Sequence, residues 1–344
     1  MKSSKKILVC YNEPKSIYKN YLGKEPDGSL SIDLSEKGLE DQIENIIYNL
    51  SNSYKHVKRF AVNSNTSSLF AEIRSFNPDT IFNLIESVEG NAQMESHIAA
   101  MFDILEVSYT GNSSLALGNC LFKQQTKRVL IGSNIPTPNY EVIKHLERIN
   151  TIGKNLKFPL IVKLLREDAS IGISENSVVK SKEELKNRIS YLFKNFKQDL
   201  LLEEYIEGRE LNVSILDNEV LPISEIDFKG LPENLPKITT YEAKWSPESD
   251  YYKHTIPVCP AKLSKRVTNK ISNIALRAFK ELDCRDYARV DIRLSKDNVP
   301  YVIEINPNPD ISPDSGFARS ATAAGISYNE LIDKLITLSI GRYY

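Results

Sequence analysis

Two neighbouring stretches tell most about this chain, Arg289-Val-Asp-Ile-Arg-Leu294 and Tyr301-Val-Ile-Glu-Ile-Asn-Pro-Asn-Pro-Asp310. In both stretches apolar and polar residues alternate, which is typical of β-strands with one buried face. The residues between them, from 295 to 300, are rich in turn formers. The pattern therefore predicts an antiparallel hairpin with one polar face.

The predicted pairing gathers oxygen ligands on that polar face. If the hairpin closes symmetrically, Asp291 lies opposite Glu304 and Arg289 lies opposite Asn306, with Cβ atoms roughly 5 Å apart. Facing carboxylates repel each other unless a cation neutralises them, and an all-oxygen ligand set favours Mg²⁺ over Zn²⁺. Asp291, Glu304 and Asn306 are therefore the candidate metal ligands, with Mn²⁺ as an alternative ion. A solvated polar face on an edge hairpin is the alternative interpretation.

The composition predicts a globular protein with several domains. The chain has 344 residues, 41% of them hydrophobic and 26% charged, which suffices for two or three cores. Lys and Arg number 44 against 45 Asp and Glu, so the positive excess that binding to a nucleic-acid backbone demands is missing. The apolar run from residue 7 to residue 10 is too short for a signal peptide or a membrane span. We expect a cytoplasmic protein with neither nucleic acid nor membrane as a partner.

Strands and helices alternate along the chain, as in a layered α/β protein. Apolar runs near the N-terminus predict a small parallel sheet, and Pro136 and Pro138 open a second unit. The stretch from Leu231 to Pro257, rich in proline and polar residues, is expected to be a long loop, and such loops inside compact domains are usually functional. We place the domains at residues 1–112, 113–205 and 206–344.

The second unit carries features of a nucleotide site. Lys163 ends an apolar strand, where a buried ammonium is costly unless it meets an anion. The turn that follows offers the Ser170 hydroxyl and backbone N–H groups to a phosphate. A strand-to-turn junction from Glu203 to Glu210 offers acceptors to adenine and ribose. A lysine at the end of a strand beside an ordinary turn, and solvated glutamates, are the alternatives.

Lys244 lies in the expected loop and is followed by the only tryptophan, Trp245. A cation on a mobile flap can reach a phosphate and shield it from water. In that case the indole of Trp245 leaves water when the flap closes. Permanent packing of this amphipathic ring on the domain surface is the alternative.

Together these features resemble the D-alanine–D-alanine ligase branch of the ATP-grasp superfamily over nearly the full length of the chain. The resemblance also rests on Tyr109-Thr-Gly-Asn-Ser113, Ile135-Pro-Thr-Pro138, Phe158-Pro-Leu-Ile-Val-Lys163 and Tyr241-Glu-Ala-Lys244. It implies an α/β, ATP-grasp fold, in which an N-terminal parallel-sheet domain precedes two α+β lobes that hold ATP between them. It also implies small amino-acid-like substrates and leaves a homodimer open.

The resemblance further assigns roles to individual residues. In that family, residues matching Asp291, Glu304 and Asn306 bind two Mg²⁺ ions, and the arginine matching Arg289 stabilises a developing oxyanion. We therefore take Arg289, Lys244 and Ser170 as the candidate catalytic residues. Lysines matching Lys123 and Lys163 contact phosphates, the segment matching 203–206 holds adenine, and the acid matching Glu210 holds the ribose. The candidate nucleotide-binding residues are Lys123, Lys163, Glu203, Glu204, Tyr205, Ile206, Glu210, Lys244 and Ile303.

The implied reaction joins a carboxylate to an amine. The carboxylate attacks the γ-phosphorus of ATP to give an acyl phosphate, and the amine then attacks the acyl carbonyl. Phosphoryl transfer needs positioning and charge neutralisation more than covalent help, which the metal ions and Lys123, Lys163 and Lys244 would supply.

The chain departs from the family where the amino acids bind. A family Gly-Gly-x-Ser-x-Glu segment is missing, and only Glu13 stands in for its glutamate. Glu86 lies at a family His-Gly pair, Ala169 and Trp245 replace a serine and a tyrosine, and Asp310 replaces the glycine of the oxyanion turn, whereas Ser315 matches a carboxylate-binding serine. The candidate substrate residues are Glu13, Glu86, Trp245, Asp310 and Ser315, and we expect a ligase for a pair other than two D-alanines. A genuine D-alanine–D-alanine ligase and a non-catalytic nucleotide-binding protein are the alternatives.

Overall fold

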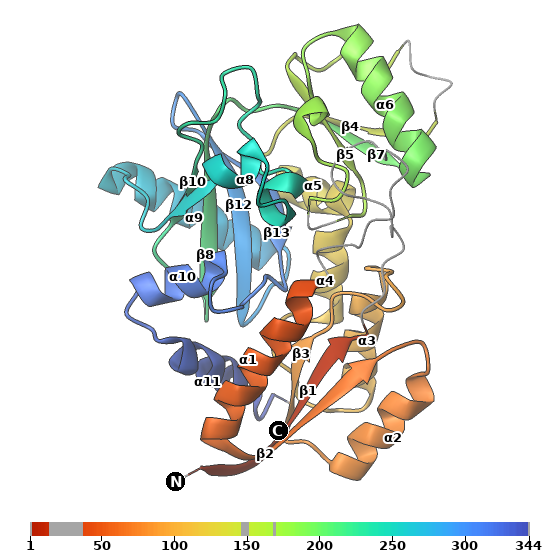
Figure 1. Ribbon diagram of the computed structural model, residues 1–344, viewed down its shortest axis with the longest axis vertical. Helices are drawn as coiled ribbons and strands as arrows, with labels where there is room; N and C mark the ends of the chain where they lie inside the picture. The colour runs from red at the N-terminus through yellow and green to blue at the C-terminus, as the bar shows by residue number, and fades with distance from the viewer. Residues whose placement is uncertain (1, 14–36, 146–150, 168–169, 343–344) are drawn as a thin grey trace.

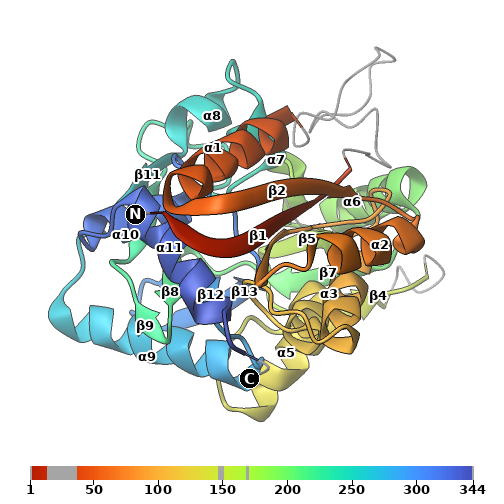
Figure 2. The same ribbon diagram turned by 90° about the horizontal axis from the view of Figure 1, so that it is seen from below.

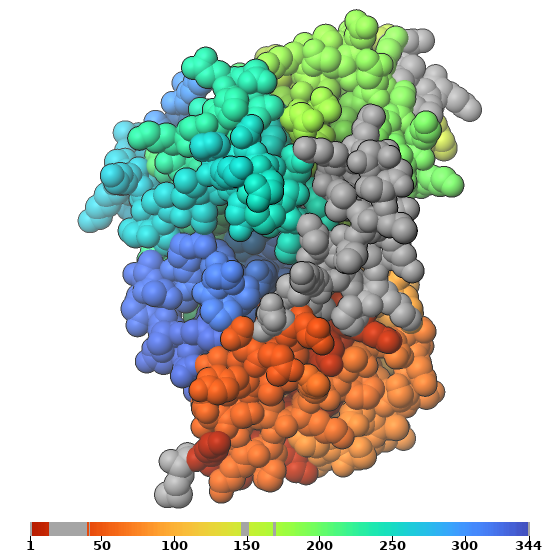
Figure 3. Space-filling view, viewed as in Figure 1, coloured from red at the N-terminus to blue at the C-terminus, as the bar shows by residue number. Residues whose placement is uncertain are grey.

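The computed structural model describes residues 2–13, 37–145, 151–167 and 170–342. Within this part of the chain the strands form three sheets, each accompanied by helices (Figure 1). The space-filling view shows the N-terminal residues as the lower part of the molecule, with the residues of the two later sheets above them (Figure 3).

The first sheet is the parallel sheet predicted near the N-terminus. Its strands lie in the order β2-β1-β3, and both pairings are parallel. Ile7 and Val9 pack with residues of α1, whereas Leu8 and Cys10 pack with residues of α2 and α3. A parallel sheet that is covered on both faces needs consecutive apolar residues, as in the run from Ile7 to Cys10. The elements are β1 (Ser3–Asn12), α1 (Lys37–Ser53), β2 (Tyr54–Val62), α2 (Thr66–Phe76), β3 (Thr80–Leu84) and α3 (Met94–Ile104).

The second sheet is antiparallel, with the strand order β4-β7-β5-β6. The helix α6 (Lys182–Phe196) packs on it through Leu185, Ile189 and Leu192, which recur at helical spacing and are buried (Figure 1). Its strands are β4 (Tyr140–Ile143), β5 (Leu160–Leu164), β6 (Val178–Val179) and β7 (Leu200–Glu204).

The third sheet contains the hairpin, in the order β11-β10-β8-β12-β13, with β9 paired to β8. The helix α9 (Lys265–Glu281) packs on it, and so do α4 (Ser114–Leu121) and α5 (Lys123–Gly132), which precede the second sheet in sequence. Its strands are β8 (Gly208–Leu216), β9 (Glu219–Val220), β10 (Ser224–Asp227), β11 (Ile256–Val258), β12 (Tyr287–Ser295) and β13 (Pro300–Asn306).

The predicted register of the hairpin is confirmed, but the hairpin is not symmetric. Arg289 pairs with Asn306 and Asp291 pairs with Glu304, whereas the next pair is Ile292 with Val302. Ile303 is therefore the extra residue of a β-bulge. The bulge compensates for a short turn, in which the N–H of residue 295 bonds to the carbonyl of residue 299 at 3.0 Å.

The stretch from Leu231 to Pro257 is not the structureless loop that we expected. It contains α7 (Tyr241–Trp245), α8 (Asp250–His254) and the start of β11. Thr240 and Ser249 begin the two helices, because each side chain accepts a hydrogen bond from the helical N–H three residues later.

Two C-terminal helices complete the chain, α10 (Gly316–Ala323) and α11 (Tyr328–Ser339). The helix α11 lies against the first sheet, as the view from below also shows (Figure 2). Leu331, Leu335 and Ile336 share one buried cluster with Ile7 and Val9 of β1. The beginning and the end of the described chain therefore build one hydrophobic core.

Candidate functional site

A polar row lies on one face of the third sheet. Across β12 and β8, Arg289 pairs with Ser214, Asp291 with Asn212 and Arg293 with Glu210. Val290 and Ile292, which alternate with these residues, are completely buried in the core. The strand period of two therefore puts charged residues on one face and α9 with the core on the other.

The carboxylate of Asp291 is held by three side chains. Arg289 donates from Nε at 2.7 Å and from Nη2 at 2.9 Å, Asn212 donates at 2.7 Å, and Asn306 donates at 3.0 Å. Burial lowers the pKa of Arg289, but Asp291, Glu304 and Asp310 together raise it above its ordinary value, so that this guanidinium is held firmly in its charged form. The predicted catalytic arginine thus contacts a predicted metal ligand.

The facing carboxylate, Glu304, is paired with the predicted phosphate lysine Lys123. Their Nζ and Oε1 atoms lie 2.8 Å apart, and Lys123 also donates to the carbonyl of Glu167 at 2.6 Å. Burial raises the pKa of Glu304, but Lys123, Lys163 and Lys244 lower it to about 2. All three predicted phosphate lysines therefore act electrostatically on one predicted metal ligand.

Glu203 is buried between two lysines. Its carboxylate accepts from Lys163 at 2.8 Å and from Lys127, and its side chain is only 1% exposed. Burial raises its pKa, but Lys127 and Lys163 lower it further. Glu203 was predicted to belong to the adenine-binding segment 203–206, but its side chain is paired with the two lysines. Sequence reasoning gave Lys127 no role, although it follows Lys123 by one helical turn, so that both lysines lie on one face of α5.

The segment from Glu204 to Glu210 contacts both neighbouring sheets. Glu204 accepts from Asn139 at 2.9 Å, and the Tyr205 N–H bonds to the carbonyl of Pro159 at 2.9 Å. The Ile206 N–H makes no hydrogen bond to the part of the chain that the structure describes. This donor lies just after the end of β7.

Glu210 accepts from Thr239 at 2.7 Å and from Arg293 at 3.0 Å. Sequence reasoning missed both partners, and it also missed Asn212. The spacing of Arg289, Asp291 and Arg293 along one strand contained the signal for Arg293, because residues two apart share a face.

The remaining catalytic and nucleotide candidates lie around these groups. Ser170 has a left-handed backbone with φ of 61°, and its hydroxyl donates to the carbonyl of Thr239 at 3.1 Å. Lys244 is exposed on α7. Ile303 is partly exposed, while Val302 and Ile305 are buried, because the bulge turns it out of the core. Ala169, where the family has a serine, lies outside the described residues.

Four of the five substrate candidates make hydrogen bonds within the described chain. Glu13 accepts from Asn63 at 3.0 Å, and the N–H of the exposed Glu86 lies 3.3 Å from Oδ1 of Asn12. The Ser315 hydroxyl caps α10, and Asp310 accepts from Ser312 at 2.6 Å.

Trp245 packs against the core of the second sheet, with its ring centroid 6.4 Å from that of Tyr241. Its indole nitrogen is buried. The ring is therefore out of water in this structure, which both permanent packing and a closed flap would produce.

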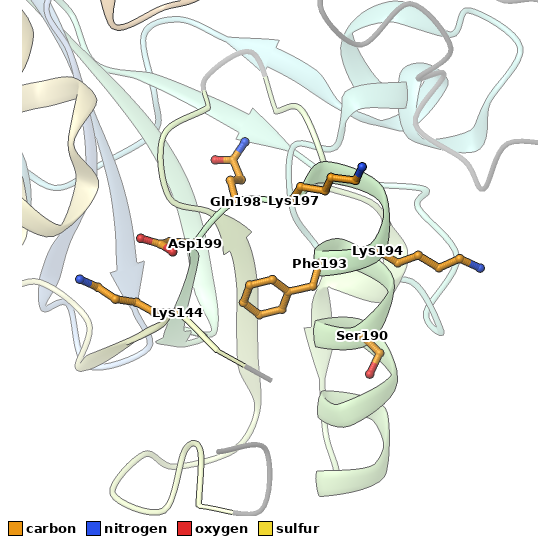
Figure 4. Close-up of a pocket in the computed structure, with 7 residues that line it drawn as sticks. All are labelled: Lys144, Ser190, Phe193, Lys194, Lys197, Gln198 and Asp199. Atoms are coloured by element: carbon orange, nitrogen blue, oxygen red, sulfur yellow. The ribbon is translucent and has the colours of Figure 1, made fainter. Parts of the chain in front are cut away.

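Two surface hollows of about 420 Å³ each lie apart from the polar row. None of the predicted catalytic, metal or nucleotide residues lines them. In the first hollow, Phe193 faces the strand side, whereas Lys194 and Lys197 point away from it (Figure 4). These two lysines of the helix end therefore do not converge on the hollow.

The described residues contain no group of three or more His, Cys, Asp and Glu side chains arranged to hold a metal ion. The predicted metal ligands Asp291, Glu304 and Asn306 include two such side chains, which is below this number. No helix of the described chain has the length and apolarity needed to cross a membrane.

Comparison with known proteins identifies the family. A family model described as the D-ala D-ala ligase C-terminus matches residues 131–337. The D-alanine–D-alanine ligase of Pseudothermotoga lettingae is 31% identical over 86% of this chain and 93% of its own length. An uncharacterized protein of Sinorhizobium fredii, y4sG, is 34% identical over 77% of this chain and 75% of its own.

A solved structure shows the same fold. The D-alanine–D-alanine ligase from Bacillus anthracis complexed with ATP matches over 99% of both chains, with a TM-score of 0.74 and 24% identity. The expected ATP-grasp architecture is thereby confirmed. The chain therefore belongs to the D-alanine–D-alanine ligase family of ATP-grasp enzymes, the ADP-forming ligases that make a C–N bond.

Proposed function

We propose that the protein is an ATP-dependent carboxylate–amine ligase that acts through an acyl phosphate and joins a substrate pair other than two D-alanines. The observation that carries this proposal is the polar row of the third sheet. There Asp291 faces Glu304, and each carboxylate contacts a cation, Arg289 or Lys123. Such a row supplies the opposite charges that a metal ion and a polyphosphate need.

The donor set fits Mg²⁺. Asp291, Glu304 and Asn306 offer two carboxylates and one amide oxygen, and Mg²⁺ bound by few protein ligands usually completes its shell with water and nucleotide phosphates. We assign two Mg²⁺ ions to these residues, with Mn²⁺ as a substitute. When bound, the ions would neutralise charge on the transferring phosphoryl group.

The residues of this chain divide the remaining work. Lys123 and Lys163 hold the phosphates, while the Ile206 N–H donates to the acceptor nitrogen of adenine. Glu210 accepts hydrogen bonds from ribose hydroxyls. Arg289 lies where it can donate to the oxyanion that forms when the amine attacks the acyl carbonyl.

The proposal of a different substrate pair is based on the candidate substrate residues. Glu13 is bonded to Asn63, and Trp245 is packed against the second sheet. Asp310 brings a carboxylate to a turn where the family has a glycine. A pocket whose polar groups do not match a ligand discriminates against it by orders of magnitude. We place the protein in the cytoplasm, where ATP and free amino acids occur together.

The test is ADP release with Mg²⁺, ATP and pairs of amino acids, followed by identification of the product. We expect one pair to release ADP rapidly and D-alanine alone to release little. Efficient formation of D-alanyl-D-alanine would instead establish the genuine ligase of that name. ATP binding without ADP release from any pair would favour a non-catalytic protein.

A further inference from the structure

Arg293 is a buried cation beside the candidate nucleotide site. Its side chain is 4% exposed, and an arginine has five N–H donors. All five are used in this structure. Nε donates to the carbonyl of Ile206 at 3.0 Å, Nη1 to Glu210 at 3.0 Å and to the carbonyl of Lys237 at 2.9 Å, and Nη2 to the Tyr205 hydroxyl at 3.0 Å and to the carbonyl of Gly208 at 3.3 Å.

The local backbone brings these acceptors within reach of one guanidinium. Arg293 pairs with Glu210 across β12 and β8, and the pairing continues to Ser295 with Gly208. Gly208 has φ of 151°, and a Cβ at this position would lie 1.9 Å from the carbonyl oxygen of Leu294. Only glycine therefore lets the turn before β8 lie this close to β12. The guanidinium also lies over the ring of Tyr205, 5.0 Å from its centroid.

Because every donor of Arg293 is occupied by the protein, this side chain has none left for a ligand. Arg293 can therefore act only through the protein groups that it contacts, Ile206 and Glu210 among them. It occupies the carbonyl of Ile206, whose N–H has no hydrogen-bond partner in the part of the chain that the structure describes. At Glu210, Arg293 bonds to one carboxylate oxygen and Thr239 to the other, and each oxygen keeps a second acceptor position. Two acceptors remain, which is the number that the two hydroxyls of a ribose require.

The same contacts extend to the second sheet. Thr239 connects to Ser170 of the turn after β5, through the Ser170 hydroxyl and the Thr239 carbonyl. Arg293 thus anchors one end of a chain of hydrogen bonds that spans the proposed ribose and phosphate positions.

We propose that Arg293 is a positioning residue that orients Glu210 and the Ile206 hinge for an adenosine nucleotide. It then determines nucleotide affinity and recognition of the ribose hydroxyls without touching the nucleotide. This inference rests on the proposed function, because it assumes that the polar row binds ATP and ADP.

The experiment measures the affinity of the full chain for ADP and for 2′-deoxy-ADP in the presence of Mg²⁺, by calorimetry. The wild-type protein should prefer ADP by roughly tenfold to a hundredfold, as expected for one hydrogen bond to a carboxylate. Arg293→Met should weaken ADP binding by about tenfold or more and bring the ratio of the two affinities close to one. Arg293→Lys should behave similarly, because an ammonium cannot reproduce the planar fork.

Arg209→Met is the matched control. Arg209 lies next to Glu210 on β8 and makes two 2.6 Å contacts to Glu225, and its replacement should leave both affinities unchanged. If Arg293→Met does not fold, Arg293→Lys, which keeps the charge, supports the same comparison. The ratio separates positioning of Glu210 from general loosening, which would weaken both nucleotides equally.

Three results would count against the inference, and they differ from one another. If the wild-type protein binds neither nucleotide, the proposed function fails and the inference fails with it. If the wild type binds ADP and both Arg293 variants keep its affinity and ratio, only the inference is overturned. An equal loss of affinity for both nucleotides, with the ratio unchanged, overturns it as well.

Discussion

At the scale of single residues, each candidate metal-binding carboxylate already has a cationic partner. Glu304 contacts Lys123 at 2.8 Å, and Asp291 contacts Arg289 at 2.7 Å. A metal ion alone would displace a lysine into water, and a phosphate alone would leave a bare carboxylate. When the metal ion and the nucleotide bind together, Glu304 exchanges Lys123 for the metal ion and Lys123 exchanges Glu304 for a phosphate. Each side chain then keeps a partner of opposite charge, so metal and nucleotide should bind more tightly together than separately.

Glu304→Gln should remove one metal ion from the site and leave the fold intact, because the amide carries no charge. In the presence of ADP, titration with Mn²⁺ followed by electron paramagnetic resonance should show one bound ion fewer than in the wild type. Turnover should fall by about two orders of magnitude or more, the scale of losing one preorganised electrostatic group. Glu207→Gln is the control, since Glu207 pairs with Lys296 on the surface. Wild-type stoichiometry and rate in Glu304→Gln would remove Glu304 from the site.

Glu203→Gln should destabilise the fold, because Lys127 and Lys163 would lose their shared anion in a buried site. Breaking a buried ion pair on one side costs about 3–5 kcal/mol, which urea unfolding can measure. Adding Lys127→Met should recover part of this loss, since one unpaired cation is removed. A variant as stable as the wild type would show that the carboxylate contributes nothing.

The same variant tests pH dependence. The pKa of Glu203 is lowered, since its two lysines outweigh the raising effect of burial. The contribution of Glu203 to the free energy of unfolding is therefore complete above the ordinary glutamate pKa of about 4.3. This contribution is lost as pH falls through the lower pKa that Glu203 has in the folded protein. The difference in unfolding free energy between wild type and Glu203→Gln should shrink as pH falls below about 4. A difference that stays constant down to the acid transition would contradict this sign.

At the scale of elements, alternation along a strand was sufficient to predict the hairpin and to pair Asp291 with Glu304. It was not sufficient to place Ile303, which the alternation assigns to the core. A bulge depends on the turn length and on the packing of Val302, and neither can be read from local pattern. The stretch from Leu231 to Pro257 was misread for a related reason. Its prolines suggested a loop, whereas the caps at Thr240 and Ser249 start helices too short to show a helical period.

The candidate site could be predicted in part for the same reason. Residues on one hairpin, such as Arg289 and Asn306, have a register that short-range pattern determines. Lys127 and Thr239 contact Glu203 and Glu210 across different elements, and only the assembled fold brings such groups together.

The packing of α7 makes a specific optical prediction. Trp245 lies against Tyr241 and the core of the second sheet, so its emission should be blue-shifted and poorly quenched by acrylamide without any ligand. Addition of Mg²⁺ and ADP should change the spectrum little. A large saturable shift, weakened in Lys244→Ala, would instead establish α7 as a moving flap.

At the scale of the whole molecule, the first sheet depends on the last helix. Leu335 of α11 is completely buried in the cluster that contains Ile7 and Val9, so Leu335→Ala should cost about 2–5 kcal/mol. Thermal unfolding followed by circular dichroism measures the loss. Thr337→Ala, at an exposed position of the same helix, should stay within about 0.5 kcal/mol of the wild type. Equal effects of the two substitutions would show that α11 is not part of the core.

The core shared by the two ends of the chain has a consequence for protein synthesis. A ribosome releases β1 and α1 long before α11, so the face of the first sheet that carries Ile7 and Val9 is covered by α1 without α11 while most of the chain is still being made. Domains normally fold in the order in which they emerge, but this one must wait for the end of translation. The nascent protein should therefore depend on chaperones at its N-terminal part, and a premature stop before α11 should yield an aggregating product rather than a shortened enzyme.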